Sequence, residues 1–418
     1  CLSRGLGDVY KRQHHNAVDN VLSLINLALL TGHVGRYGSG LNPLRGQNNV
    51  QGGGDMGAIP NRLVGFQDIL DPAVRARFEK AWGVKLKPEY GYTMTQMFEA
   101  MDAGRMKGLY VIGENPAQSE ADQHHAEAML EGLDHFVVQD VFLTRTAQLA
   151  DVVLPASSSW CESEGTVTNS ERRVQRVRKA LEPPGQARDD MAIISDIAKR
   201  LGHDWHNPGA EDVWNEVRTM APAMFGGMSF RRLEECQGLQ WPCPDESHPG
   251  SLFLHGRLWE EPLSGPRVPF IPAEDEPPVE MPDEDYPFML TTGRRLDSYN
   301  TGVQTGGYTS PLRRPESLEI SPEDAAKLGV EDDDIVRVTS RRGSVTAPIR
   351  IDRGLRAGLV FMTLHFQDQV RVNLLTIDAT DPKSGTAEFK ACAVRLEPVR
   401  VVAPALEEPE AELVAGDD

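Results

Sequence analysis

One polar segment of the chain, residues 41–57 with the sequence LNPLRGQNNVQGGGDMG, gathers the side chains best suited to hold a ligand. Side-chain amides donate and accept hydrogen bonds in fixed geometry, a guanidinium fits a carboxylate or phosphate in a two-point contact, and glycines let backbone N–H groups approach a ligand. These groups come from Arg45, from Gln47, Asn48, Asn49 and Gln51, and from the glycines at 52–54. The segment predicts a lining for a polar, planar ligand. The alternative is a solvated, turn-rich loop.

The elements that must position these groups follow as strand, turn and helix patterns at 108–118, 135–150 and 151–157. Each begins with a short β-branched run, which is typical of buried parallel strands. In a doubly wound sheet, ligands bind outside the carboxyl ends of the strands. The polar residues at those ends are Gly113, Glu114, Asn115, Gln139 and Asp140, with Thr144 close behind. A carboxylate there can accept hydrogen bonds from a guanine or from ribose hydroxyls, or these residues merely cap turns and helices.

A basic run stands out in this acidic chain at residues 160–181, WCESEGTVTNSERRVQRVRKAL. Gly165, Thr168 and Asn169 come just before it, and Arg172 is among its first basic residues. Part of this positive charge is expected to face a pyrophosphate. The alternative assigns most of the arginines to a solvated face, which leaves Asn169 and Arg172 as the ligand candidates.

Helical spacing elsewhere predicts a packed helix from Asp19 that stops at Gly32, and a helix from Thr93 to Met101 with core methionines. Residues 203–285 appear irregular, and the acidic, proline-rich stretch at 272–287 predicts a linker without a core of its own. From Tyr286 the pattern becomes β-rich, with one short helix that begins after Ser321 and a hairpin around 341–343.

The phrases NPLRGQNNVQG and EGT-x-TN-x-ERR-x-Q resemble the molybdopterin oxidoreductase superfamily, and within it the formate dehydrogenase alpha subunits. The resemblance implies a fold: an α/β doubly wound, mostly parallel sheet, followed by a C-terminal double-psi β-barrel. It also implies a cofactor, bis-molybdopterin guanine dinucleotide carrying molybdenum or tungsten. The rivals are another oxidoreductase of the superfamily, such as a nitrate reductase, and a non-catalytic electron-transfer scaffold like the large subunit of complex I.

The same resemblance implies roles for individual residues. Formate would bind with its carboxylate on Arg45, and Gln47 could project near the same pocket. Gly165, Thr168 and Asn169 gain weight as cofactor ligands. In the barrel, the positions that would approach the cofactor are Gly293, Arg294, His365, Phe366, Asn373 and Lys390. After the Gly-Arg pair, Arg295, Leu296 and Asp297 depart from the family pattern.

The expected division of the chain has five parts. These are a foreign N-terminal end (1–13), a molybdopterin-binding α/β region (14–204), an irregular segment with a linker (205–285), the dinucleotide-binding barrel (286–399) and an acidic, disordered tail (400–418). The family carries its [4Fe-4S] segment and its metal-ligating cysteine or selenocysteine upstream, so no metal ligand is assigned here. The chain is expected to be a C-terminal fragment without activity of its own. His14 and His15 are possible acid or base groups, although a surface role is favoured.

The composition excludes other classes of protein. The formal net charge of -19 argues against nucleic acids and anionic membrane surfaces as partners. No apolar run approaches the roughly 18 residues of a membrane span. Five cysteines without a C-x-x-C pair favour free thiols and a cytoplasmic location. The expected partners are formate and electron-transfer subunits or domains with iron–sulfur or flavin groups.

Overall fold

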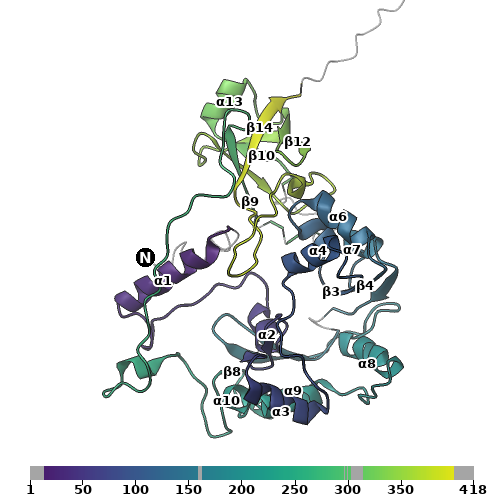
Figure 1. Cartoon of the computed structure of the whole chain (residues 1–418), viewed down its shortest axis with the longest axis vertical. Helices are drawn as coiled ribbons and strands as arrows, with labels where there is room; N and C mark the ends of the chain where they lie inside the picture. The colour runs from purple at the N-terminus through teal and green to yellow at the C-terminus, as the bar shows by residue number, and fades with distance from the viewer. Residues whose placement is uncertain (1–13, 159–161, 296, 299, 303–313, 400–418) are drawn as a thin grey trace, which may run out of the picture.

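The computed structural model describes residues 14–158, 162–295, 297–298, 300–302 and 314–399. Three predictions concern residues outside these ranges. They are the foreign N-terminal end, the disordered tail, and Leu296 as one of the residues that depart from the family pattern. Figure 1 shows a barrel at the top, a parallel-sheet unit to its lower right, a lobe of helices and short strands at the bottom, and an arm that carries α1 on the left. The polar segment 41–57 lies near the centre, where α2 (Val50–Asp55) is placed.

The parallel-sheet unit confirms the three strands expected from the sequence. Its strands are β3 (Gly108–Ile112), β4 (His135–Asp140) and β5 (Val152–Pro155), all parallel and in that order. The helices of this unit are α4 (Met94–Asp102), α5 (Pro116–Ser119), α6 (Gln123–Glu131), α7 (Arg145–Gln148) and α8 (Asp190–Arg200). Phe98, Met101, Leu130, Phe136 and Val138 form its core. A capping box of Thr93 and Gln96 begins α4 close to the predicted position.

The lower lobe differs from the irregular structure expected for residues 203–285. It contains α9 (Ala210–Met220), α10 (Pro222–Phe225) and α11 (Phe230–Glu235), packed on an antiparallel sheet of β6 (Gly165–Thr168), β7 (Arg173–Val177) and β8 (Leu239–Gln240). Trp214, Val217 and Phe225 pack against Val174 of β7. The core was missed because it depends on β7, which lies far away in the sequence. The lobe also holds β1 (Arg62–Leu63), β2 (Gln67–Asp68) and α3 (Pro72–Trp82).

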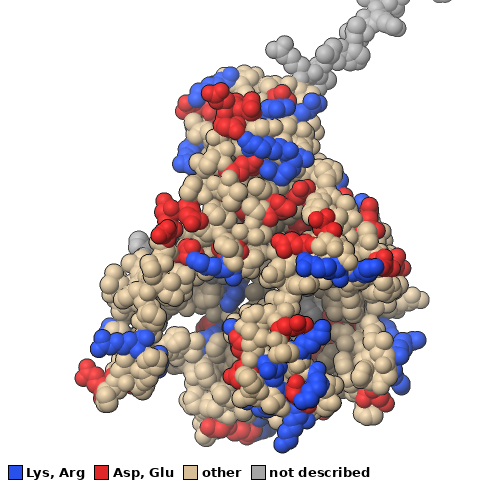
Figure 2. Space-filling view, in the orientation of Figure 1, with Lys and Arg blue, Asp and Glu red and all other residues tan. Residues whose placement is uncertain are grey.

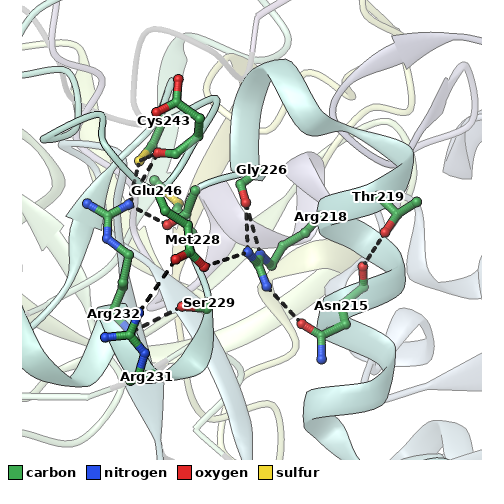
Figure 3. Close-up of polar contacts among 12 residues, drawn as sticks. Asn215, Arg218, Thr219, Gly226, Met228, Ser229, Arg231, Arg232, Cys243 and Glu246 are labelled. Carbon is green, nitrogen blue, oxygen red and sulfur yellow. Dashed lines mark hydrogen bonds and ion pairs between the residues drawn. The ribbon is translucent and has the colours of Figure 1, made fainter.

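Two arginines, Arg218 and Arg232, stabilise the loop that follows β8 by contacts with residues 243–248 (Figure 3). Arg232 donates from Nη2 to the carbonyl of His248 at 2.9 Å, and from Nη1 toward Sγ of Cys243 at 3.6 Å. Arg218 donates to the carbonyl of Gly226 at 2.8 Å, and its guanidinium lies 3.6 Å from the carboxylate of Glu246. Half-buried guanidinium groups such as these can donate to several carbonyls at once. They fix the course of the chain beside Trp241, which matters for the site described below.

The C-terminal barrel is confirmed. Its strands are β9 (Phe288–Gly293), β10 (Leu318–Ile320), β11 (Ile335–Thr339), β12 (Ser344–Ile351), β13 (Leu359–Thr363) and β14 (Cys392–Pro398), closed in the order β10-β12-β11-β14-β9-β13. The predicted hairpin is the antiparallel pair β11–β12, and the predicted helix is α13 (Pro322–Leu328), capped by Ser321. A short turn, η3 (Val372–Leu374), faces α6.

The arm consists of α1 (Ala17–Leu30) and the segment that contains η2 (Gly256–Trp259). Nε1 of Trp259 donates to the carbonyl of Val34 at 2.7 Å. The sequence predicted a packed helix here, but in α1 only Ala17 is buried and Leu30 is 74% exposed. The apolar positions that predicted the packing, Val21, Leu22, Ile25 and Leu29, are only half-buried among the described residues. In the described part of the chain, no helix has the length and apolar character needed to cross a bilayer.

Candidate functional site

The polar segment folds as a loop followed by the short helix α2, and it packs against β6. Asn49 takes a left-handed conformation with φ of 65°, and its Oδ1 accepts a hydrogen bond from the backbone N–H of Thr168 at 2.9 Å. A Cβ atom on Gly52 would lie only 1.9 Å from that oxygen. Gly52 is therefore required by the packing of Asn49, whereas a Cβ on Gly53 or Gly54 would meet open space.

Arg45 lines a large cavity of about 1100 Å³. Its Nη2 donates to Oε1 of Gln51 at 3.0 Å, and its backbone N–H donates to Oγ of Ser170 at 3.2 Å. The opposite walls come from the arm, around Gly38, and from the segment around Phe253. The surface in Figure 2 is hollowed between the barrel, the parallel-sheet unit and the lower lobe. Arg45 thus combines an anion-binding group with an open approach.

A second cavity, of about 260 Å³, lies at the carboxyl ends of β3 and β4. Predicted site residues from three distant parts of the sequence meet there: Gln47 from the polar segment, Gly113, Glu114, Asn115, Asp140 and Thr144 from the parallel-sheet unit, and Arg294 from the barrel. Arg45 and Gln47 therefore face different cavities, although one pocket was expected for both. The backbone at Gly46 runs between the two.

Carboxyl groups give the second cavity its electrostatic character. Oδ1 of Asp140 accepts a hydrogen bond from the backbone N–H of Phe142 at 3.0 Å, but burial raises the pKa of Asp140 above its ordinary value. Burial also raises the pKa of Glu120 to about 7, and the neighbouring carboxylate of Glu114 adds to this effect. Arg294 supplies the opposite charge at the same cavity. The cavity can accept hydrogen bonds from a ligand and also offers one cationic contact.

Three of the predicted residues form hydrogen bonds inside the protein. Oδ1 of Asn115 accepts a hydrogen bond from Oγ1 of Thr146 at 2.7 Å, which ties α5 to α7. Gln139 is fully buried, and its Nε2 donates to Asp190 at 2.5 Å while its Oε1 accepts from the hydroxyl of Tyr110. Thr144 caps α7 by accepting from the backbone N–H of Ala147 at 3.1 Å. These bonds hold the strand ends in place.

On the barrel side, His365 fixes the loop that reaches the second cavity. Its Nε2 accepts from the backbone N–H of Arg295 at 2.8 Å, so its proton is on Nδ1, which donates to the carbonyl of Asn300 at 2.7 Å. Burial lowers the pKa of His365, which favours this neutral form. Gly293 is buried at the end of β9, and Nζ of Lys390 donates to the carbonyl of Thr292.

The other barrel residues face the parallel-sheet unit. Nδ2 of Asn373 donates to the carbonyl of Gln118 at 3.0 Å, while Oδ1 of Asn373 is buried without a hydrogen-bond partner among the described residues. Phe366 lines a third cavity, of about 440 Å³, which it shares with Thr144 and Arg371. The seam between the barrel and the sheet unit is therefore lined with polar groups.

Predicted residues of the basic run lie apart from the second cavity. Oδ1 of Asn169 accepts from the backbone N–H groups of Glu171 and Arg173, which closes the turn between β6 and β7. Arg172 donates to the carbonyls of Trp241 and Ser251, and it lines the cavity of Arg45. Gly165 begins β6, and a Cβ there would meet open space. Thr168 is buried beside Asn49.

Sequence reasoning missed Asn300 and Glu120, which line the second cavity, and Asp55, which lines the cavity of Arg45. Asn300 lies in the barrel loop that departs from the family pattern, and nothing in the sequence pairs it with Gln47. Glu120 could have been noticed as the next acidic residue after the GENP turn. Across the described ranges, no cluster of three or more His, Cys, Asp or Glu side chains is arranged to hold a metal ion.

Two family models match the chain. "Molybdopterin oxidoreductase" matches residues 8–200, and "Molydopterin dinucleotide binding domain" matches residues 288–393. The first match includes residues 8–13, which were expected to be foreign.

Among curated proteins, the chain is 44% identical over 391 residues to the F420-dependent formate dehydrogenase subunit alpha of Methanocaldococcus jannaschii, covering 92% of this chain and 56% of that protein. It is 38% identical over 393 residues to the assimilatory nitrate reductase catalytic subunit of Bacillus subtilis, covering 91% and 54%. The chain spans about half the length of these relatives.

Among solved structures, acetylene hydratase from Pelobacter acetylenicus superposes with a TM-score of 0.62 at 16% identity, covering 93% of this chain and 60% of that one. At this identity the likeness concerns the fold alone.

Proposed function

Because the chain belongs to the molybdopterin oxidoreductase superfamily, we propose that it forms part of a molybdenum- or tungsten-dependent formate dehydrogenase that holds a bis-molybdopterin guanine dinucleotide. The observation that carries the proposal is the second cavity, where the polar segment, the ends of β3 and β4 and the barrel loop meet. Its neighbour, the cavity of Arg45, supplies an anion-binding group beside it. When bound, the cofactor supplies a centre that accepts the two electrons of formate oxidation.

The residues present fit the guanine dinucleotide. Gly113 has φ of 63°, and a Cβ there would meet open space, so the backbone can approach a ligand closely. The carboxylates of Glu114 and Asp140 are suited to accept from the ring N–H and exocyclic amine of guanine, and Arg294 is suited to a phosphate. The guanine end is therefore assigned to Gly113, Glu114, Asn115 and Asp140. Asn169 was also expected to be a cofactor ligand, but it does not line the second cavity, and its Oδ1 accepts hydrogen bonds in the turn between β6 and β7.

Arg45 is proposed to bind formate. A guanidinium can make two parallel hydrogen bonds to a carboxylate, which neutralises and orients a one-carbon anion that has no other handle. Oxidation of formate to CO2 releases two electrons and one proton, with the C–H bond broken. Clamping the two oxygens directs the C–H bond away from Arg45. Electron-transfer subunits or domains with iron–sulfur or flavin groups would take the electrons onward.

Nitrate reduction is the second candidate, because a nitrate reductase is also similar to the chain. The NPLRGQNNVQG phrase, with its arginine, favours formate. We also propose that the 418 residues alone do not turn over formate, since they span 56% of the formate dehydrogenase subunit that they resemble. A complete subunit that contains this chain should carry molybdenum or tungsten together with guanine nucleotide, and should reduce a viologen dye with formate. If the complete subunit oxidises reduced viologen with nitrate and shows no formate activity, formate oxidation is contradicted and nitrate reduction is supported.

A further inference from the structure

A buried carboxylate lies behind Arg45. Asp55 ends α2, and only 1% of its surface is exposed. Its Oδ1 accepts from Nε2 of Gln51 at 2.8 Å, and its Oδ2 accepts from Nε1 of Trp241 at 2.9 Å. Oε1 of the same Gln51 accepts from Nη2 of Arg45 at 3.0 Å. Asp55 and Arg45 are thus joined through one amide.

Asp55 determines the direction of the hydrogen bonds in this path, that is, which groups donate and which accept. An ionised carboxylate only accepts hydrogen bonds, so it holds the NH2 group of the Gln51 amide, and the amide oxygen must then point toward Arg45. Gln51 and Asp55 are four residues apart on one helix, which places both side chains on the same face. Each donor in the path has a matching acceptor, so the path favours the orientation of the guanidinium in which Nη2 faces Gln51.

We propose that Asp55 is a positioning residue that sets the orientation of the Arg45 guanidinium through Gln51, and so sets the affinity for the anionic substrate. This inference rests on the proposed role of Arg45 in formate binding. An uncharged amide as the direct partner holds the guanidinium by a hydrogen bond while the carboxylate stays one side chain away. Along this path the carboxylate of Asp55 does not contact the guanidinium, so it weakens the attraction of Arg45 for a small anion less than a direct ion pair would.

Trp241 anchors the far end of the path. Its backbone N–H donates to the carbonyl of Arg172 at 3.2 Å, and the guanidinium of Arg172 lies 5.3 Å from the centre of its ring. The arginines of the lower lobe hold the loop that follows it. Trp241 is therefore placed by the lobe core, and its indole N–H fixes the second oxygen of Asp55.

Protonation of Asp55 would break the path. Burial raises the pKa of Asp55 to about 6, against the opposing effects of the bonds from Gln51 and Trp241 and of the Arg45 charge. Arg45 is the charged group that acts on Asp55. Protonation turns one of the two carboxyl oxygens into a donor, so either the bond from Gln51 to Oδ1 or the bond from Trp241 to Oδ2 is weakened. The anion affinity of Arg45 should consequently fall as the pH drops through about 6.

The first test needs no cofactor. In the 418-residue chain, the indole N–H resonance of Trp241 should titrate with a midpoint near pH 6, and Asp55→Asn should abolish this titration. Asp102→Asn is the matched control, because Asp102 is an exposed aspartate that ends α4, so the same substitution removes the same charge outside the cavity and the path. A Trp241 titration that persists in Asp55→Asn, or that is absent from the unsubstituted chain, would overturn the inference.

The second test uses the complete, cofactor-loaded enzyme. Asp55→Asn should raise KM for formate by about ten-fold while changing kcat less, since a hydrogen bond to a charged group is lost or misdirected. Gln51→Leu should do the same, and the double variant should be no worse than Gln51→Leu alone because both act through one path. Asp102→Asn should behave like the unsubstituted enzyme.

An unchanged KM in Asp55→Asn, or additive effects in the double variant, would contradict the positioning role. If Asp55→Asn does not fold, Gln51→Leu alone tests the same path, because an unchanged KM there also contradicts the role. A complete enzyme without any formate turnover would instead contradict the proposed function. The indole titration of Trp241 would still decide whether the path exists.

Discussion

The side-chain amide of Gln47 donates a hydrogen bond to Oδ1 of Asn300 at 2.9 Å, across 253 positions of the sequence. This bond joins the polar segment to the barrel loop at the second cavity, which both residues line. Asn300 is placed in turn by His365, whose Nδ1 donates to the Asn300 carbonyl. The barrel therefore contributes to the candidate cofactor site, and the shape of that site depends on how the barrel is placed.

Breaking this bond should weaken cofactor retention. In a complete enzyme, Gln47→Ala and Asn300→Ala should each lower the guanine nucleotide content after dialysis, and the double variant should lose less than the sum. A coupling of about 0.5–1.5 kcal/mol is expected for one hydrogen bond. Strictly additive losses would show that the two side chains act independently.

Asp140 should be needed to hold the cofactor. Asp140→Ala should reduce the molybdenum or tungsten and guanine content of the complete enzyme, because it removes an acceptor from the second cavity. Asp134→Ala is the matched control, since Asp134 is an exposed acid just before β4 that pairs with Lys107. Full cofactor content in Asp140→Ala would remove Asp140 from the site.

Asn373 should contribute to the stability of the chain. Its Nδ2 donates to the carbonyls of Gln118 and Ser119 at 3.0 and 3.3 Å, between the barrel and α5. Asn373→Ala should lower the free energy of unfolding by about 0.5–1.5 kcal/mol, since the half-buried residues Gln118 and Ser119 lose the donor to their carbonyls. Urea unfolding measures this loss, and Asn20→Ala on the exposed face of α1 serves as the control. Equal stability of the two variants would refute the role.

Glu120 should make stability depend on pH. Its pKa in the folded chain is about 7, above the ordinary 4.5, so folding favours the protonated form. The stability that it contributes is fully present below pH 4.5 and is lost as the pH rises through about 7. Glu120→Gln should flatten this part of the stability profile, whereas the exposed Glu131→Gln should not. Identical profiles for the two variants would show that Glu120 ionises freely.

The sequence was most informative where patterns are local. The alternation in β11 and β12 and the β-branched runs of β3 to β5 predicted the barrel hairpin and the parallel sheet. The polar segment and the strand ends supplied Gln47, Gly113, Glu114, Asn115, Asp140 and Thr144 to the lining of the second cavity. These features depend on neighbours in sequence, which a single chain displays.

Contacts between distant segments could not be predicted in the same way. The core of the lower lobe needs Val174 beneath Trp214, and the closure of the second cavity needs Asn300 against Gln47. Asn169 was expected to bind the cofactor because of the family phrase that contains it, yet its side chain closes the turn between β6 and β7. Type and spacing identify a group that can bind, but only the fold decides which cavity it faces.

Arg45 provides the most direct test of the central claim, that the chain belongs to an enzyme which oxidises formate at this site. In a complete enzyme, Arg45→Lys keeps the charge but loses the planar two-point contact, and Arg45→Ala loses both. The account predicts that kcat/KM for formate falls by roughly ten- to a hundred-fold or more, with Ala worse than Lys and cofactor content unchanged. If Arg45→Ala instead loses the cofactor while formate turnover per bound metal stays normal, Arg45 binds the cofactor and the formate assignment is contradicted.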